Sequence, residues 1–205
     1  MKILIVAATN DEIQLLKDVN LLNHKIDFLV TGPGMVSTTY ELTKHLTKNT
    51  CELAINCGIA GSFDKSISIG EVVSVKEDTF SEPGAEDGDA FLTLSELGLV
   101  GKVKFKNKFQ LQPLSAIQLK EVRGITVNTV HGDDKNIQTI ITRLKPQIES
   151  MEGAAFFYVC EKENIPSLQI RSISNYIERR NKANWNVPLA LENLNATLGK
   201  LITSL

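Results

Sequence analysis

The chain has 205 residues, of which 42% are hydrophobic and 22% charged, values that are ordinary for a soluble globular protein. A net charge of −2 without a basic run argues against a nucleic-acid partner, and no apolar run reaches the roughly 18 residues of a membrane span. Three cysteines without a C-x-x-C pair and three scattered histidines predict reduced thiols, a cytoplasmic location and no metal site. The apolar run 3–8 could mimic a signal-peptide core, but it is short and polar, acidic residues follow it, so it predicts a buried strand.

Strands and helices are expected to alternate along the chain. Apolar or alternating segments predict strands at 3–8, 27–31, 53–57, 70–77, 125–130 and 167–174. Helical periodicity and capping residues predict helices at 10–17, 36–46, 133–144, 152–163 and 188–205. Segment 81–88 predicts a polar, acidic loop, and the Lys-rich segment 101–124 predicts a surface excursion. The alternation predicts one α/β domain over residues 1–205, a three-layer sandwich with a mixed, mainly parallel central sheet.

Two carboxylates follow predicted strands. Glu12 lies one turn into the first helix, where it can point into the crevice above an open sheet. Glu152 opens a helix, whose N-terminus favours negative charge, and its carboxylate can accept hydrogen bonds from two adjacent hydroxyls such as a ribose diol. Asn10 and Asp11 fit the role of helix caps, and an ordinary helix-start acid is the alternative for Glu152.

Glycines and polar residues mark the other strand ends. Gly58-Ile59-Ala60-Gly61 follows a buried strand, and glycines there let a backbone approach a ligand closely. Gly32-Pro33-Gly34 lacks the G-x-G-x-x-G spacing of a dinucleotide site and predicts a plain turn. Ser174-Asn175 ends a further strand, at the edge where an open α/β sheet binds its ligand. Arg171, on the same apolar strand, is expected to pair with a buried acid rather than to touch substrate.

The order of these motifs resembles the superfamily of purine nucleoside phosphorylases and nucleosidases. The resemblance runs nearly end to end and rests on Glu12, Gly32-x-Gly34, Ile55-Asn56-Cys57-Gly58-x-Ala60-Gly61, Gly70-Glu71-Val72-Val73, Met151-Glu152-Gly153-Ala154-Ala155 and Arg171-Ser172-Ile173-Ser174. It implies a nucleoside phosphorylase-like fold, a small nucleoside as substrate, no cofactor, and a homo-oligomer in which a neighbouring subunit closes each site. Glu12, or Asp11 if the register differs by one, would activate a nucleophile, and Glu152 would hold the ribose hydroxyls.

Asn175 departs from the adenine nucleosidases of this superfamily, which cleave methylthioadenosine and adenosylhomocysteine and carry an Asp general acid after the serine. The futalosine hydrolase branch shares the Asn. That branch also resembles the chain in Gly84-Ala85-Glu86-Asp87-Gly88-Asp89, Leu97-Gly98-Leu99 and Trp185-x-x-Pro188. An amide cannot ionise, but it can donate to O6 of hypoxanthine and accept from a protonated N7, so Asn175 suits a 6-oxopurine leaving group. The resemblance therefore favours release of hypoxanthine from futalosine, a reaction of menaquinone biosynthesis.

Hydrolysis is favoured over phosphorolysis, because the chain has only five arginines and places carboxylates where phosphate would need cations. Residues expected to line the sugar and base pocket are Gly58, Ala60, Gly61, Val130, Met151 and Ser174. Arg179 and Arg180 are expected near a substrate carboxylate remote from the base, with solvated surface charges as the alternative. Two other functions stay open: a methylthioadenosine/adenosylhomocysteine nucleosidase, and a non-catalytic purine-binding module, against which the retention of Glu12 and Glu152 weighs.

Overall fold

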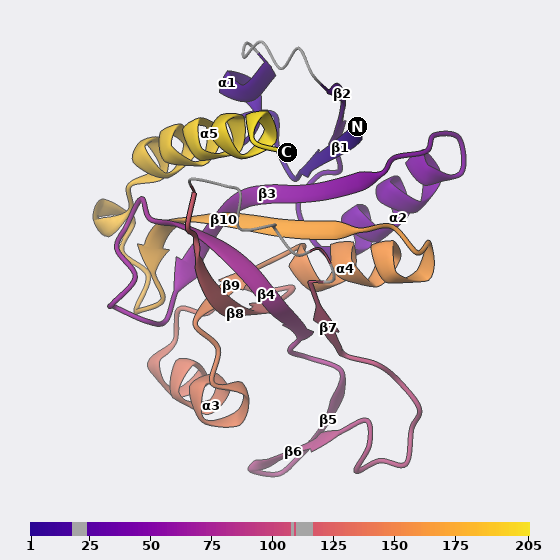
Figure 1. The fold of residues 1–205 in the computed structure, drawn as a ribbon. Coiled ribbons are helices and arrows are strands. Elements are labelled where there is room, and N and C mark those ends of the chain that lie inside the picture. The colour runs from indigo at the N-terminus through magenta and orange to yellow at the C-terminus, as the bar shows by residue number, and fades with distance from the viewer. Residues whose placement is uncertain (18–23, 108, 110–116) are drawn as a thin grey trace.

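A computed structural model describes residues 1–17, 24–107, 109 and 117–205 (Figure 1). The strands are β1 (Lys2–Ala7), β2 (Lys25–Val30), β3 (Leu53–Ser62), β4 (Val72–Phe80), β5 (Gly84–Asp87), β6 (Ala90–Thr93), β7 (Lys104–Lys106), β8 (Lys120–Thr126), β9 (Ile148–Ser150) and β10 (Ser167–Tyr176). The helices are α1 (Gln14–Lys17), α2 (Met35–Leu46), α3 (Asp134–Leu144), α4 (Gly153–Lys162) and α5 (Val187–Thr203), with a short 3₁₀ turn at Lys182–Asn184. None of the helices in these described ranges is long and apolar enough to cross a membrane.

The main sheet is mixed and mostly parallel. Its strands follow the order β10-β4-β8-β9-β3-β1-β2, with β7 paired to β4. β10 also pairs with β3 in parallel, so β3, β10, β4, β8 and β9 form a closed ring of strands. The α/β class and the mixed, mainly parallel sheet are confirmed. The expected three-layer sandwich describes the part of the sheet around β1, β3 and β10, whereas β3, β10, β4, β8 and β9 close into a partial barrel with irregular registers in β4 and β10.

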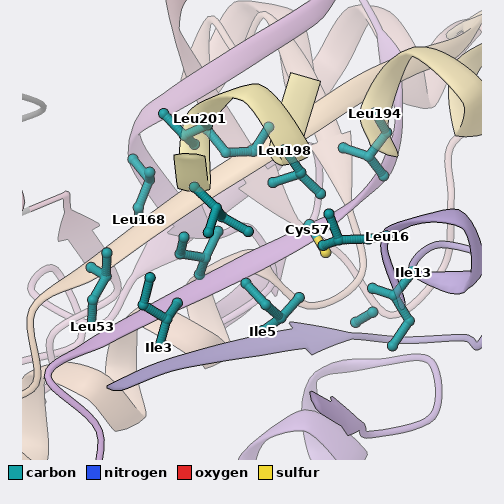
Figure 2. Close-up of a cluster of buried hydrophobic side chains, with 14 residues drawn as sticks. Ile3, Ile5, Ile13, Leu16, Leu53, Cys57, Leu168, Leu194, Leu198 and Leu201 are labelled. Atoms are coloured by element: carbon teal, nitrogen blue, oxygen red, sulfur yellow. The ribbon is translucent and has the colours of Figure 1, made fainter. Parts of the chain in front are cut away.

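Helices cover both sides of the sheet around β1, β3 and β10 (Figure 1). On one side α1 and α5 pack over a cluster of aliphatic side chains drawn in Figure 2, among them Ile3, Ile5, Leu16, Leu168, Leu194 and Leu198. On the other side α2 and α4 enclose a second cluster, which includes Leu4, Val6, Leu42, Phe156 and Phe157. Because β1 contributes alternate residues to both clusters, its continuous apolar run is explained by burial on two faces.

Several predicted boundaries differ from the structure. The predicted strand 125–130 lies instead at β8, whose residues alternate between exposed and buried at its start, a pattern hidden within the Lys-rich stretch. Residues 127–133 consequently form a loop before α3. The predicted loop 81–88 contains β5, which pairs with β6 as a hairpin. Parts of the predicted surface excursion, residues 108 and 110–116, lie outside the described residues.

Candidate active site

Glu12 is held by the backbone. It lies in the turn between β1 and α1 and is 8% exposed. Its Oε2 accepts hydrogen bonds from the amides of Ala8 and Thr9, both at 3.0 Å, and its Oε1 accepts one from Ile59 at 3.1 Å. Burial raises the pKa of Glu12, against the lowering effects of the Arg171 guanidinium and of these amides. A carboxylate with a raised pKa and a fixed position has the properties of a general base.

Glu152 occupies the N-cap position of α4 without capping it. Its Oε1 accepts a hydrogen bond from the Gly34 amide at 2.9 Å, and its Oε2 accepts a longer one from Met151 at 3.3 Å. Gly32 and Gly34 have φ values of 79° and 94°, which favour glycine. The Gly32-Pro33-Gly34 turn therefore does more than reverse the chain, because it presents the Gly34 amide at the start of α2 to a carboxylate 118 residues away.

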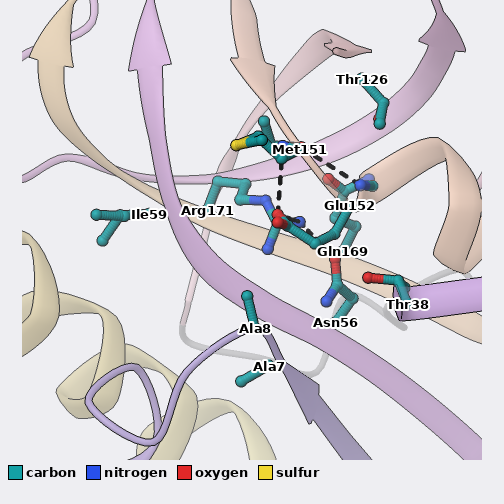
Figure 3. Close-up of polar contacts among 12 residues, drawn as sticks. Ala7, Ala8, Thr38, Asn56, Ile59, Thr126, Met151, Glu152, Gln169 and Arg171 are labelled. Atoms are coloured by element: carbon teal, nitrogen blue, oxygen red, sulfur yellow. Dashed lines mark hydrogen bonds and ion pairs between the residues drawn. The ribbon is translucent and has the colours of Figure 1, made fainter. Parts of the chain in front are cut away.

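Arg171 is 1% exposed and lies beside Glu152 (Figure 3), and its charge also acts on Glu12. Its Nη2 is 3.9 Å from Oε2 of Glu152 and donates to the side-chain oxygen of Asn56, whose own amide nitrogen donates to the Val6 carbonyl at 3.0 Å. As expected from the sequence, Arg171 pairs with a buried acid. Its charge offsets the mutual repulsion of two buried carboxylates. We call Glu12, Glu152 and Arg171 the carboxylate centre.

Gly58 makes room for this centre. A Cβ at position 58 would stand 2.5 Å from Oε1 of Glu12 and 2.9 Å from Nη1 of Arg171. The predicted turn at 58–61 is wrong, because β3 continues through this segment to Ser62 and pairs with β10 there. These glycines therefore serve close packing within a strand. Gly61 has the same role, since its Cβ would meet Ile177 and lie 3.2 Å from the Asn175 amide nitrogen.

A second group of residues surrounds a small cavity of about 60 Å³, which we call the base pocket. Its lining includes Gly61, Val130, Asn175 and Arg180, four residues singled out from the sequence, and also His131, Glu149, Tyr176, Ile177, Glu178, Asn181 and Trp185. Larger cavities exist elsewhere, such as one of about 730 Å³ beside α5, but its lining contains none of the predicted site residues. The presence of predicted site residues in its lining, rather than cavity size, makes this pocket the candidate for the predicted base site.

Asn175 is aimed by an irregular register in β10 between Ile173 and Asn175. Its side-chain oxygen accepts a hydrogen bond from the Ser174 hydroxyl at 2.8 Å, and its amide nitrogen donates to the Tyr176 carbonyl at 3.0 Å. The Ser174 hydroxyl also lies 3.3 Å from the Ala60 carbonyl. Ser174 and Ala60 are buried, so in this structure they position Asn175.

The two predicted arginines are separated. Arg180 stacks over the Trp185 ring, 4.9 Å from its centroid, and lines the base pocket beside Asn175. Arg179 is exposed and does not line that pocket. If Asn175 contacts the base, Arg180 therefore lies at the base end of the ligand and not at the remote end expected from the sequence.

The sequence reasoning missed Glu149. It lies in β9, is 1% exposed, and accepts hydrogen bonds from the backbone amide of His131 at 2.9 Å and from the His131 ring, whose Nδ1 is 2.7 Å away. The available signal was a second acid, Glu149, three residues before Glu152 at the same strand end. Successive residues of a strand point to opposite faces, so two acids near one strand end can contact two different groups at the same edge of the sheet.

Buried carboxylates beside a small polar pocket, at the ends of parallel strands, define an α/β enzyme that acts on a small polar ligand. A family model described as the phosphorylase superfamily matches residues 19–204. The chain belongs to this superfamily, which confirms the resemblance seen in the sequence.

Individual relatives narrow the class. The futalosine hydrolase of Thermus thermophilus is 30% identical over 181 residues, which span 85% of this chain and 80% of that protein. The 5'-methylthioadenosine/S-adenosylhomocysteine nucleosidase of Shewanella oneidensis is 30% identical over 196 residues, spanning 84% of this chain and 78% of that protein. A mutant of the corresponding nucleosidase of Helicobacter pylori, solved with 5'-methylthioadenosine in its active site, shares the fold with a TM-score of 0.86 at 19% identity, covering 100% of this chain and 99% of that chain. The prediction of a nucleosidase-type enzyme with a nucleoside phosphorylase-like fold is confirmed.

Proposed function

We propose that the protein hydrolyses the N-ribosyl bond of futalosine and releases hypoxanthine and dehypoxanthine futalosine, a step of menaquinone biosynthesis. The observation that carries this proposal is Asn175, which lines the base pocket with an amide that cannot ionise. A site that reads a 6-oxo group with an amide leaves buried polar atoms unpaired when a 6-amino group enters. The similarity to futalosine hydrolases supports the same substrate.

In this proposal Glu12 is the base. It takes a proton from water as the water oxygen attacks the anomeric carbon, while the bond to the purine breaks through an oxocarbenium-like state. Glu152 accepts hydrogen bonds from the ribose hydroxyls, and its contact with Gly34 fixes the carboxylate for that purpose. Two carboxylates beside the sugar disfavour a phosphate nucleophile, so hydrolysis is the reaction that the charges of the site support.

The second candidate is a methylthioadenosine/adenosylhomocysteine nucleosidase, favoured by the equal identity of the Shewanella relative. A non-catalytic purine-binding module is a third reading, but a binder has no need of the raised pKa and triple amide support of Glu12.

Product analysis separates these candidates. The protein is incubated separately with futalosine, inosine and methylthioadenosine, and free base is measured by chromatography. Hypoxanthine release from futalosine, at a kcat/KM above that for methylthioadenosine, supports the proposal. A preference for methylthioadenosine overturns it in favour of the second candidate, and no free base from any substrate supports a binding module.

We also propose that the protein is a homo-oligomer. Exposed apolar side chains gather over a cavity of about 710 Å³ where α2 begins, directly after the turn that holds Glu152. Val36 and Tyr40 are 77% and 62% exposed there. A second copy covering this face would also close the carboxylate centre. Sedimentation velocity should show Tyr40→Glu as smaller than wild type. The matched control is Leu15→Glu, an exposed apolar position on α1, which covers the other side of the sheet.

Two further expectations belong to this proposal. Residues 1–205 are proposed to form a single domain, because one core cluster joins Ile3 near the start to Ile202 near the end. A cytoplasmic location is supported by the free state of Cys51, Cys57 and Cys160.

A further inference from the structure

The proposed reaction lacks a proton donor. A purine leaves more easily when its N7 gains a proton, but Asn175 cannot supply one because an amide does not ionise. His131 is an ionisable side chain in the base pocket, and its own side chain is 17% exposed. Histidine is the side chain whose ordinary pKa lies nearest neutrality, so it can hold and release a proton under working conditions.

Glu149 holds His131 at two points. One carboxylate oxygen accepts from the His131 backbone amide at 2.9 Å, and the other accepts from Nδ1 at 2.7 Å. The edge of the neighbouring Phe63 ring packs against the imidazole, with 6.2 Å between centroids. The loop runs beside the segment after β10, since a Cβ at Gly132 would stand 3.7 Å from the Cβ of Arg180. The imidazole therefore has a defined position and a proton on Nδ1, as in acid–base pairs where a carboxylate orients a histidine.

The second ring nitrogen is available to a ligand. Within residues 1–17, 24–107, 109 and 117–205, no hydrogen bond is found at Nε2 of His131, although the ring lines the same pocket as Asn175. A surface loop can be closed without a buried acid whose two carboxylate oxygens both bind the same histidine. The arrangement instead matches a group that must present one nitrogen accurately.

We propose that His131, oriented by Glu149, is the general acid that protonates the departing purine. This inference rests on the proposed nucleoside hydrolysis. The imidazolium gives its Nε2 proton to N7, and the electron pair of the C1'–N9 bond goes to the base. Water bonds to C1' and loses its proton to Glu12. His131 is then neutral and Glu12 protonated, and exchange of a proton with solvent restores both. Asn175 meanwhile donates a hydrogen bond to O6.

Other charges around the pocket affect the pH profile. Ionisable side chains that line the pocket with His131 are Glu149 from β9, Tyr176 from β10, and Glu178 and Arg180 from the segment after β10. Lys65 lies 3.9 Å from Glu178 and 5.9 Å from the Tyr176 ring centroid. Because the proposed step needs a proton on Nε2, kcat is expected to fall toward high pH. Glu178→Gln serves to show that this basic limb does not come from Glu178.

The test compares His131→Gln with wild type on two leaving groups. Gln can donate a hydrogen bond but cannot transfer a proton, so kcat for futalosine and inosine should fall by about 10²- to 10⁴-fold and the basic limb should disappear. Hydrolysis of 4-nitrophenyl riboside, whose phenolate leaves without protonation, should stay within about threefold of wild type. His45→Gln, on α2, is the matched control, because the His45 side chain is 16% exposed and also lies beside a carboxylate, that of Asp27, and it should change neither rate.

Several outcomes would overturn the inference. One is a His131→Gln variant that keeps the wild-type rate and basic limb on a purine nucleoside. Another is an equal loss on both leaving groups with a lowered melting temperature, which would indicate a structural role. If 4-nitrophenyl riboside is a poor substrate, the loss or retention of the basic limb in His131→Gln decides whether His131 is the general acid. Failure of the wild type on futalosine overturns only the proposed substrate if inosine is cleaved, and the His131 comparison is then made on inosine. If no nucleoside is cleaved, both proposals fall.

Discussion

The carboxylate centre and the base pocket lie at the same edge of the sheet but are built differently. The acids of the carboxylate centre are buried and bound by backbone amides from segments far apart in sequence, as in the contact of Glu152 with Gly34. The base pocket is formed by the loop before α3 and the segment after β10, and Asn175 bonds mainly to its chain neighbours. Glu12 and Glu152 are thus held by contacts from across the fold, whereas Asn175 is held by contacts that can change locally.

The strongest test of the carboxylate centre is Glu12→Gln. We expect a loss of about 10⁴-fold in kcat with little change in substrate binding, because the amide cannot accept a proton. In wild type, kcat/KM should fall on the acid side at a pH above the ordinary pKa range of a glutamate. This follows because the base must be ionised and the pKa of Glu12 is raised. Steady-state kinetics across pH, with calorimetry for binding, checks this. Asp11→Asn is the control, since Asp11 is exposed. A large loss of kcat in this variant would assign the role of base to Asp11 in place of Glu12.

Asn175→Asp changes the base pocket without touching the centre. The Ser174 hydroxyl can still donate to the new carboxylate, but the second oxygen would face the Tyr176 carbonyl, which favours the protonated acid. We expect kcat/KM to shift by about 10³-fold from the hypoxanthine nucleoside toward an adenine nucleoside. Measuring both substrates in both proteins decides it. Unchanged preference would mean that Asn175 only caps its own strand end.

A pair of glycine substitutions compares the spatial tolerance of the two regions. The Cβ of Gly58→Ala would displace Glu12 or Arg171, and a shift of about 1 Å in a catalytic group can cost about 10²-fold in rate. Gly132→Ala, beside the base pocket, meets its nearest neighbour at 3.7 Å and should cost less than threefold. Kinetics and melting temperatures of both variants provide the check, and equal losses would contradict the contrast between the regions.

Asp78 provides a test of stability behind the carboxylate centre. Burial raises its pKa to about 6, although Gln169 and Thr126 donate hydrogen bonds to it. Folding is therefore favoured by protonation between about pH 4 and 6, and this stability is lost as pH rises through that window. Because Asn does not titrate, Asp78→Asn should gain on the order of 1 to 3 kcal/mol relative to wild type between pH 4.5 and 8.

Urea unfolding at both pH values measures this difference. Asp64→Asn is the control and should show no comparable change, because hydrogen bonds from Ser66 lower the pKa of Asp64 to below the range compared. A flat difference for Asp78→Asn would mean that Asp78 does not change its protonation on folding.

The smallest effect is expected from Arg179→Ala. Arg179 is exposed and lies outside the base pocket, so KM for futalosine should change by less than about twofold. Arg180→Ala should raise KM more, because Arg180 lines the pocket and packs on Trp185. A larger change in KM for Arg179→Ala would support the contact with a substrate carboxylate that the sequence predicts.

Local patterns in the sequence predicted the regular elements well where capping and apolar periodicity agree. Asp133 caps α3 as expected, accepting from the Asn136 amide, and α2 and α4 start within a residue of their predicted positions. The strand β8 was misplaced because three of its seven residues are charged and exposed, and periodicity alone does not distinguish such a strand from a loop. The closure of β10 on β3 could not be predicted, because strand pairing between distant segments leaves no local signal.

For the site too, local patterns in the sequence pointed to candidate residues but not to their partners. Residue types at strand ends pointed to Glu12, Glu152 and Asn175 as candidates. Their partners were not predictable, because the Gly34 amide, the Ile59 amide and Glu149 act through contacts set by strand register.

The three backbone amides that bind Glu12 also determine which substitutions the sequence can accept around this carboxylate. Peptide N–H groups at Ala8, Thr9 and Ile59 are the same whatever side chain stands there, so those positions can mutate while the carboxylate stays in place. Gly58 lacks this freedom, because any Cβ enters the space of the acid. Substitutions at those three positions should therefore leave the carboxylate of Glu12 in place, whereas any side chain at position 58 displaces it.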